Sequence, residues 1–132
     1  MEWESCVHLP ERLSPMVRSY LETAEWSAGL EAEQREALRN ASWPEWEAES
    51  IKRAEVDCAD FLSYCAGQGI KTSGLDDEGL GFHFWLTHNR HGAGFWDGDY
   101  PEPLGRQLTD AAHTFGGCAV EYDAENERLS LI

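Results

Sequence analysis

Apolar residues recur at steps of three and four along the middle of the chain, and they form its clearest structural pattern. The residues of this run are Ile51, Ala54, Cys58, Phe61, Leu62 and Cys65. This spacing places side chains on one face of an α-helix. Because Gly67 follows in a position typical of a helix C-terminus, we expect an amphipathic helix between Pro44 and Gly67. It should be the longest helix and the centre of the core.

Two further helices are predicted on either side of this one. Ser14 followed by Pro15 is typical of an N-cap and a first helical residue, and apolar residues then repeat at helical spacing as far as Ala24. A second helical stripe runs over 104–115 and is closed by two glycines. Both segments therefore predict amphipathic helices.

Two other segments have the composition of β-hairpins. Aromatic and β-branched residues predict a pair of strands at Phe82–Thr87 and Ala93–Trp96 with a tight turn between them. At the other end of the chain, Ala119–Tyr122 and Arg128–Ile132 flank a polar turn. Helices first and hairpins later predict an α+β fold: N-terminal helices packed on a small antiparallel sheet built from two hairpins with a helix between them. Residues 1–132 are expected to form a single acidic domain.

The charge of the chain excludes one class of function. The sequence has 25 Asp and Glu residues against 10 Lys and Arg, a net charge of −15. Proteins bind a phosphate backbone through clustered cations, whereas the bases here are scattered singly. We therefore expect no direct binding of nucleic acid.

The sequence also predicts a cytoplasmic location. The first residues lack the basic region and apolar run of a signal peptide, and no stretch approaches the roughly 20 apolar residues of a membrane span. The cysteines, which are Cys6, Cys58, Cys65 and Cys118, show no metal-binding spacing. Reduced thiols and no contact with a membrane are expected.

The segment from Phe84 to Asp97, which reads Phe-Trp-Leu-Thr-His-Asn-Arg-His-Gly-Ala-Gly-Phe-Trp-Asp, resembles the signature of a family of small hypothetical proteins encoded by bacteriophages, prophages and plasmids. Residues 14–27, 57–62 and 105–116 resemble the same family in the same order. The resemblance implies a genomic setting, with the host cytoplasm as the location, and a fold. It implies no reaction.

The chain departs from the family pattern around the predicted turn. Family members usually carry His-Asp where Phe82 and His83 stand, Arg where His88 stands, and Asn-Gly where Asn89 and Arg90 stand. An Asn-Gly turn requires positive φ at both central residues, which arginine tolerates poorly. The predicted turn should therefore be longer or bulged in this chain.

Residues 27–49 contain the candidate partner-binding site. A short exposed helix and a loop are expected here, because Trp43-Pro44 interrupts any helix. Exposed tryptophans rimmed by acids are typical of a binding patch, and the residues of this candidate are Trp43, Trp46, Glu45, Glu47 and Glu49. The plainer interpretation is that the tryptophans only cover the end of the long helix.

A metal site is the alternative. His83, His88, His91 and Asp97 lie on or beside the predicted hairpin, and imidazoles with a carboxylate are ligands for zinc or iron. The plainer interpretation is a structural hairpin whose polar side chains bond its own backbone. A nucleophilic pair of Cys118 with His113 is also open, although buried thiols are usually inert.

No catalytic motif of a known class occurs, so we expect no enzyme and no cofactor. The leading hypothesis is a phage- or mobile-element-encoded accessory protein that binds a host protein with a basic surface, such as an anti-defence inhibitor or DNA mimic that occupies a nucleic-acid-binding cleft. The alternatives are a small metal-binding protein or metal-assisted enzyme, and a structural or assembly factor. The oligomeric state does not follow from the sequence.

Overall fold

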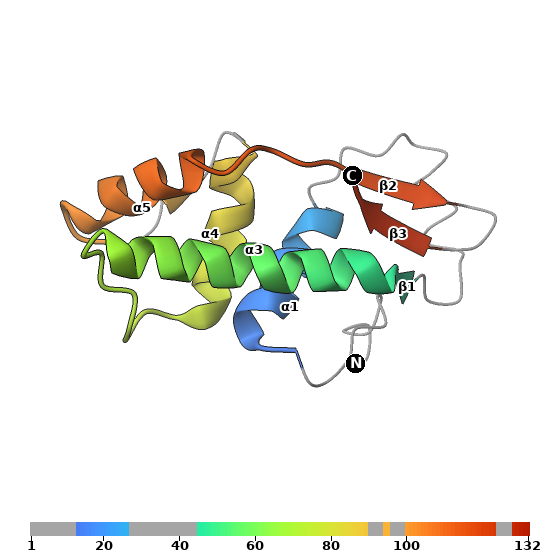
Figure 1. The fold of residues 1–132 in the computed structure, drawn as a ribbon, viewed down its shortest axis with the longest axis horizontal. Coiled ribbons are helices and arrows are strands. Elements are labelled where there is room, and N and C mark those ends of the chain that lie inside the picture. Colours follow the sequence, from blue (N-terminus) through green and yellow to red (C-terminus); the bar gives the residue numbers. More distant parts are fainter. Residues whose placement is uncertain (1–12, 27–44, 90–93, 96–99, 124–127) are drawn as a thin grey trace.

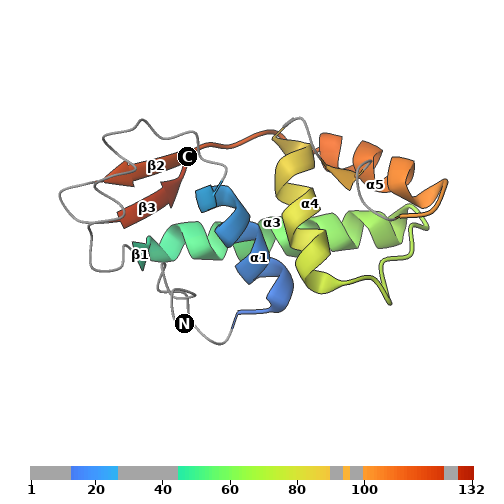
Figure 2. The ribbon, with the colours of Figure 1, turned by 180° about the vertical axis from the view of Figure 1, so that it is seen from behind.

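The computed structural model describes residues 13–26, 45–89, 94–95, 100–123 and 128–132 (Figure 1). Within these ranges the architecture is α+β, as predicted. The helices are α1 (Pro15–Trp26), α3 (Ala48–Gly67), α4 (Asp77–His88) and α5 (Leu104–His113), and the strands are β1 (Glu45–Trp46), β2 (Val120–Asp123) and β3 (Arg128–Leu131). Helices α1 and α4 lie on one side of α3, while the sheet and α5 lie towards its opposite ends (Figures 1 and 2).

Three predicted helices are confirmed. α1 follows Ser14, whose hydroxyl accepts a hydrogen bond from the Val17 amide at 3.2 Å, as expected of an N-cap. α3 is the longest of the described helices, and the face that it buries is the predicted one, with Ile51, Ala54, Cys58, Phe61 and Cys65. α5 occupies most of the segment predicted to be helical over 104–115.

The first predicted hairpin is wrong, because Phe82–Thr87 lies within α4 and not in a strand. The Asp76 side chain caps α4 by accepting a hydrogen bond from the Gly79 amide at 2.9 Å. Asp77 and Glu78 occupy the first turn, where carboxylates are stabilised by the helix dipole. α4 is buried along most of its length between α1 and α5. A helix buried on nearly all sides lacks an apolar stripe, so its sequence resembles that of a buried strand.

Helices α1 and α4 cross at a glycine. A Cβ atom built on Gly81 of α4 would collide with the carbonyl oxygen of Met16 and would lie 2.9 Å from the amide nitrogen of Tyr20, both on α1. The Ser19 hydroxyl of α1 donates a hydrogen bond to the carbonyl oxygen of Glu78 at 2.7 Å. The two backbones therefore approach so closely that any side chain at Gly81 would force them apart.

The sheet has the strand order β1-β3-β2. β2 and β3 pair antiparallel, with Tyr122 opposite Leu129, which confirms the C-terminal hairpin. β1 pairs in parallel with β3, so that Trp46 also lies opposite Leu129, and this strand was not predicted. One hairpin, and not two, is present among the described residues, since residues 94 and 95 of the other predicted strand are not in a strand.

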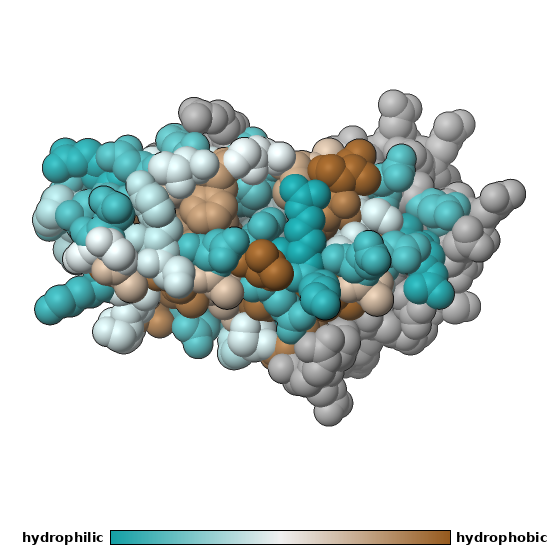
Figure 3. All heavy atoms as spheres, viewed as in Figure 1, coloured by the Kyte–Doolittle hydropathy of each residue, from teal (hydrophilic) through white to brown (hydrophobic). Residues whose placement is uncertain are grey.

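Aromatic side chains fill the core between the helices. Phe61 of α3 stacks on Phe84 of α4 with ring centroids 4.2 Å apart, and Tyr20 of α1 packs edge-on to Trp85 of α4. Trp85 is 2% exposed and belongs to the core, whereas Trp96 lies outside the described residues. On the face that carries α3, hydrophilic side chains surround only small, separate hydrophobic patches (Figure 3).

Candidate functional site

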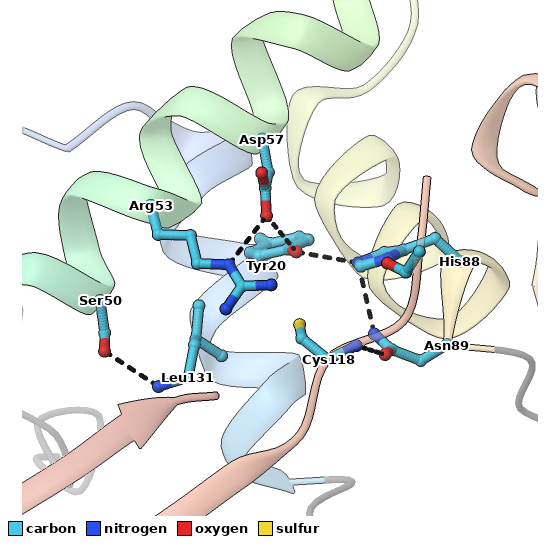
Figure 4. Close-up of polar contacts among 9 residues, drawn as sticks. Tyr20, Ser50, Arg53, Asp57, His88, Asn89, Cys118 and Leu131 are labelled. Carbon is cyan, nitrogen blue, oxygen red and sulfur yellow. Dashed lines mark hydrogen bonds and ion pairs between the residues drawn. The ribbon is translucent and has the colours of Figure 1, made fainter. Parts of the chain in front are cut away.

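An open groove of about 650 Å³ lies between the start of α3 and β3. Its lining residues are Glu47, Glu49, Ser50, Arg53, Ser130 and Leu131. The Leu131 amide donates to the Ser50 hydroxyl at 2.9 Å (Figure 4), and the Glu47 amide donates to the carbonyl oxygen of Leu129 at 2.8 Å. These two bonds fix the first turn of α3 against β3, and they thereby set the position of the carboxylates at the groove.

The groove has an excess of negative charge. The one cation among its lining residues, Arg53, is held by Asp57 one turn along α3, with 3.7 Å between Nε and Oδ2. Across the part of the chain that the structure describes, no hydrogen bond or ion pair engages the carboxylate of Glu47 or Glu49. Glu49 lies in the first turn of α3, close to the positive end of the helix dipole. The groove is therefore suited to a cationic side chain.

Two of the five predicted partner-binding residues, Glu47 and Glu49, thus line a groove. The prediction is wrong for Trp46, which is 3% exposed and is covered where β1 meets β3. Its buried indole nitrogen has no hydrogen-bond partner among the described residues. Trp46 therefore belongs to the core and not to an exposed patch. Trp43 and the side chain of Glu45 lie outside the described residues.

The predicted histidine cluster is not assembled in the described part of the chain. His83 and His88 both lie on α4, about 140° apart around the helix axis. Nδ1 of His83 lies 2.9 Å from the carbonyl oxygen of Gly79 and 3.0 Å from the Tyr100 hydroxyl. Within the described ranges, no group of three or more His, Cys, Asp or Glu side chains is placed to hold a metal. His91 and Asp97 lie outside those ranges.

His88 belongs instead to a buried polar cluster that the sequence did not predict (Figure 4). Its Nδ1 lies 3.0 Å from the carbonyl oxygen of Gly116, and its Nε2 lies 2.8 Å from the hydroxyl of Tyr20. A carbonyl oxygen only accepts, so Nδ1 carries the hydrogen and Nε2 of the neutral ring accepts from Tyr20. The Tyr20 oxygen also lies 3.5 Å from Oδ2 of Asp57. The cluster therefore joins α1, α3 and α4 to the segment before β2.

Asn89 completes the cluster at the end of α4. Its Oδ1 accepts a hydrogen bond from the Cys118 amide at 2.6 Å. Its Nδ2 donates to the carbonyl oxygen of Trp85 at 3.0 Å and lies 3.3 Å from Nε2 of His88. Because the Cys118 donor and the Trp85 acceptor together fix the orientation of the amide, Asn89 presents hydrogens to Nε2.

Burial sets the ionisation of this cluster. Burial raises the pKa of Tyr20 and of the Cys118 thiol. It lowers the pKa of His88, and the nearby Arg53 charge lowers that pKa further. The nucleophilic form of cysteine is the thiolate, which a raised pKa disfavours. Cys118 lies close to Tyr20 (Figure 4), and no hydrogen bond between Cys118 and His113 is found among the described residues. Within the described ranges Cys58, Cys65 and Cys118 are free cysteines.

Glu25 near the end of α1 is expected to make stability depend on pH. Burial, with the Glu22 charge added, raises its pKa from 4.5 to about 7. The contribution of Glu25 to stability is therefore complete below about pH 4.5 and is lost as the pH rises through 7. Glu25→Gln should leave the free energy of unfolding unchanged at pH 4.5 and raise it by about 1–2 kcal/mol at pH 8, after allowance for solvent screening. Urea melts at the two pH values test this, and an equal effect at both would contradict it.

Comparisons with known proteins found no relative: no model of a protein family matches the chain, and searches of curated proteins and of solved structures gave no match. The resemblance to the phage and plasmid family stays a prediction. None of the helices in the described ranges has the length and apolar composition needed to cross a bilayer.

Proposed function

We propose that this protein is a phage- or mobile-element-encoded accessory protein that acts by binding a host protein, and that the groove at Glu47 and Glu49 receives basic side chains of that partner. The observation that carries the proposal is a pair of carboxylates in the groove that make no ion pair with any described residue, in a chain whose net charge is −15. The protein acts in the host cytoplasm.

The net charge determines the class of partner. An acidic protein attracts basic surfaces over a distance of about a Debye length and associates with them at a rate that falls with ionic strength. The phosphate-binding cleft of a nuclease or another nucleic-acid-binding defence protein is a basic surface of this kind. The proposed partner is therefore such a protein, and the acidic surface takes the place of the phosphates.

The groove provides the specific contact within this general attraction. Glu47 and Glu49 lie on a rigid helix start that β3 holds through the Leu129 and Leu131 bonds, so little order is lost when they bind. A lysine or arginine entering between them meets two carboxylates and the hydroxyls of the serines that line the groove. Removing both carboxylates should weaken binding by about 1–2 kcal/mol, roughly tenfold in Kd.

Affinity capture from nuclease-treated bacterial lysate tests the proposal. The immobilised protein should retain a basic protein at low salt and release it at moderate salt, and the purified partner should then bind Glu47→Gln/Glu49→Gln about tenfold more weakly than the parent protein. Nuclease treatment ensures that no nucleic acid bridges the two proteins.

Asp60→Asn/Asp110→Asn is the matched control, because it removes the same charge from exposed positions on α3 and α5. It should change Kd by less than about threefold. Failure to retain any basic protein that salt releases would contradict the proposed partner class. Equal losses for the two double variants would contradict the groove as the contact site.

A further inference from the structure

The 116–118 segment is fastened to α4 by two hydrogen bonds, and the one made by Asn89 depends on the protonation state of the neighbouring His88 ring. The segment leads from α5 past the end of α4 to β2 (Figure 1). One bond runs from Nδ1 of His88 to the carbonyl oxygen of Gly116, and the other from the Cys118 amide to Oδ1 of Asn89. Whatever loosens this attachment also loosens the start of the C-terminal hairpin.

The contacts around Nε2 suit only the neutral ring. Nε2 faces two donors, the Tyr20 hydroxyl at 2.8 Å and Nδ2 of Asn89 at 3.3 Å. A proton added to Nε2 turns it from an acceptor into a donor. Tyr20 can adapt, because its hydroxyl can rotate to accept from Nε2 and donate to Asp57. Asn89 cannot adapt, because the only acceptor in its side chain is Oδ1, which holds the Cys118 amide.

We propose that His88 is a proton-controlled latch. In its neutral form it allows Asn89 to hold the backbone of Cys118, which fastens the C-terminal hairpin to α4. In its protonated form Nε2 is a donor that faces a second donor, Nδ2 of Asn89. The Asn89 side chain must then turn away and release the Cys118 amide.

The other groups around His88 set how readily a proton enters. From α3, the Arg53 charge opposes an imidazolium and the Asp57 carboxylate favours one through Tyr20. Also near Tyr20 are the thiols of Cys58 on α3 and Cys118, which are uncharged at neutral pH. The remaining neighbours on α4 are the rings of Phe84 and Trp85, and α5 brings no charged group into contact with His88 among the described residues. Burial is the main effect on the ring and lowers its pKa.

Nuclear magnetic resonance on the full, isotope-labelled chain between pH 7.5 and 4.5 tests the latch. At neutral pH the His88 ring should carry its hydrogen on Nδ1. As the pH falls, His88 should titrate with a midpoint below 6.5. With the same midpoint, the Cys118 amide should lose protection from exchange by about tenfold beyond the intrinsic effect of pH.

Two substitutions separate the latch from a general effect of acid. In His88→Gln the side chain cannot be protonated, so the acid-induced step at Cys118 should disappear. In Asn89→Asp one carboxylate oxygen can still accept from the Cys118 amide. The other can accept from Nε2 when His88 is protonated. His88 should then titrate about one unit higher than in the parent protein, and Cys118 should stay protected.

Three results would overturn the proposal: a hydrogen on Nε2 at neutral pH, an unchanged acid step in His88→Gln, or loss of Cys118 protection in Asn89→Asp with the midpoint of the parent protein. If His88→Gln does not fold, Asn89→Asp decides alone, because it keeps the imidazole and replaces the Nδ2 group, which faces Nε2 and donates to the carbonyl oxygen of Trp85.

Discussion

Gly81→Ala is expected to destabilise the protein by at least about 3 kcal/mol, because the new methyl group would collide with the backbone of α1 and not with a side chain that can turn aside. Helix propensity alone would favour alanine at this position. A fall in the free energy of unfolding would therefore come from the close crossing of α1 and α4. Urea melts followed by circular dichroism measure the difference.

Gly67→Ala is the control for this substitution. Gly67 is the last residue of α3, is exposed, and has no atom within 4 Å of the position of a Cβ. Alanine there should change the free energy of unfolding by less than about 0.5–1 kcal/mol, in the stabilising direction if at all. If the two variants melted alike, α1 and α4 would not approach as closely as the structure shows.

Trp85→Ala is expected to cost about 3–5 kcal/mol. The indole is 2% exposed and lies edge-on to both Tyr20 and His88, so its removal leaves a cavity next to the buried polar cluster. Circular dichroism suits the measurement, because the substitution removes one of the tryptophans on which a fluorescence signal would depend.

Phe82→Ala on the same helix serves as the comparison. Phe82 is 36% exposed, so truncation loses less buried area and should cost under about 1.5 kcal/mol. A cost under about 1 kcal/mol for Trp85→Ala itself would mean that this ring is not part of the core.

Local patterns were sufficient for the elements whose two sides differ in burial. α3 buries one face and exposes the other, and the predicted residues Ile51, Phe61 and Cys65 are the ones inside. Ser14 before Pro15 located the start of α1 for a reason that is equally local, since the cap bond spans three residues. Such signals do not depend on the rest of the fold.

α4 could not be predicted in this way, because its burial comes from distant segments. Its residues Phe84, Trp85, Leu86 and Thr87 are buried in succession, so no helical period remains in the sequence. The signal that was available is Asp76 with the acids after it, which together cap a helix.

The candidate site was predictable in its charge and not in its geometry. The acids around Glu47 and Glu49 are visible in the sequence. The groove is not, because β3 forms one of its sides. Trp46 is buried because β1 pairs with a strand 83 positions later in the chain. The polar cluster left a weaker signal. Tyr20 lies on an apolar helix face and Asp57 lies beside the buried Cys58, but neither position identifies His88 as the partner.

The order of the strands has a consequence for synthesis. β1 and β2 both pair with β3, which the ribosome makes after both of them, so neither strand has its partner until β3 has left the exit tunnel. α3 is made long before this point, with Glu47 directly before it and Glu49 in its first turn. The helices can therefore assemble on the nascent chain, while recognition through the groove must wait until translation has passed Leu131.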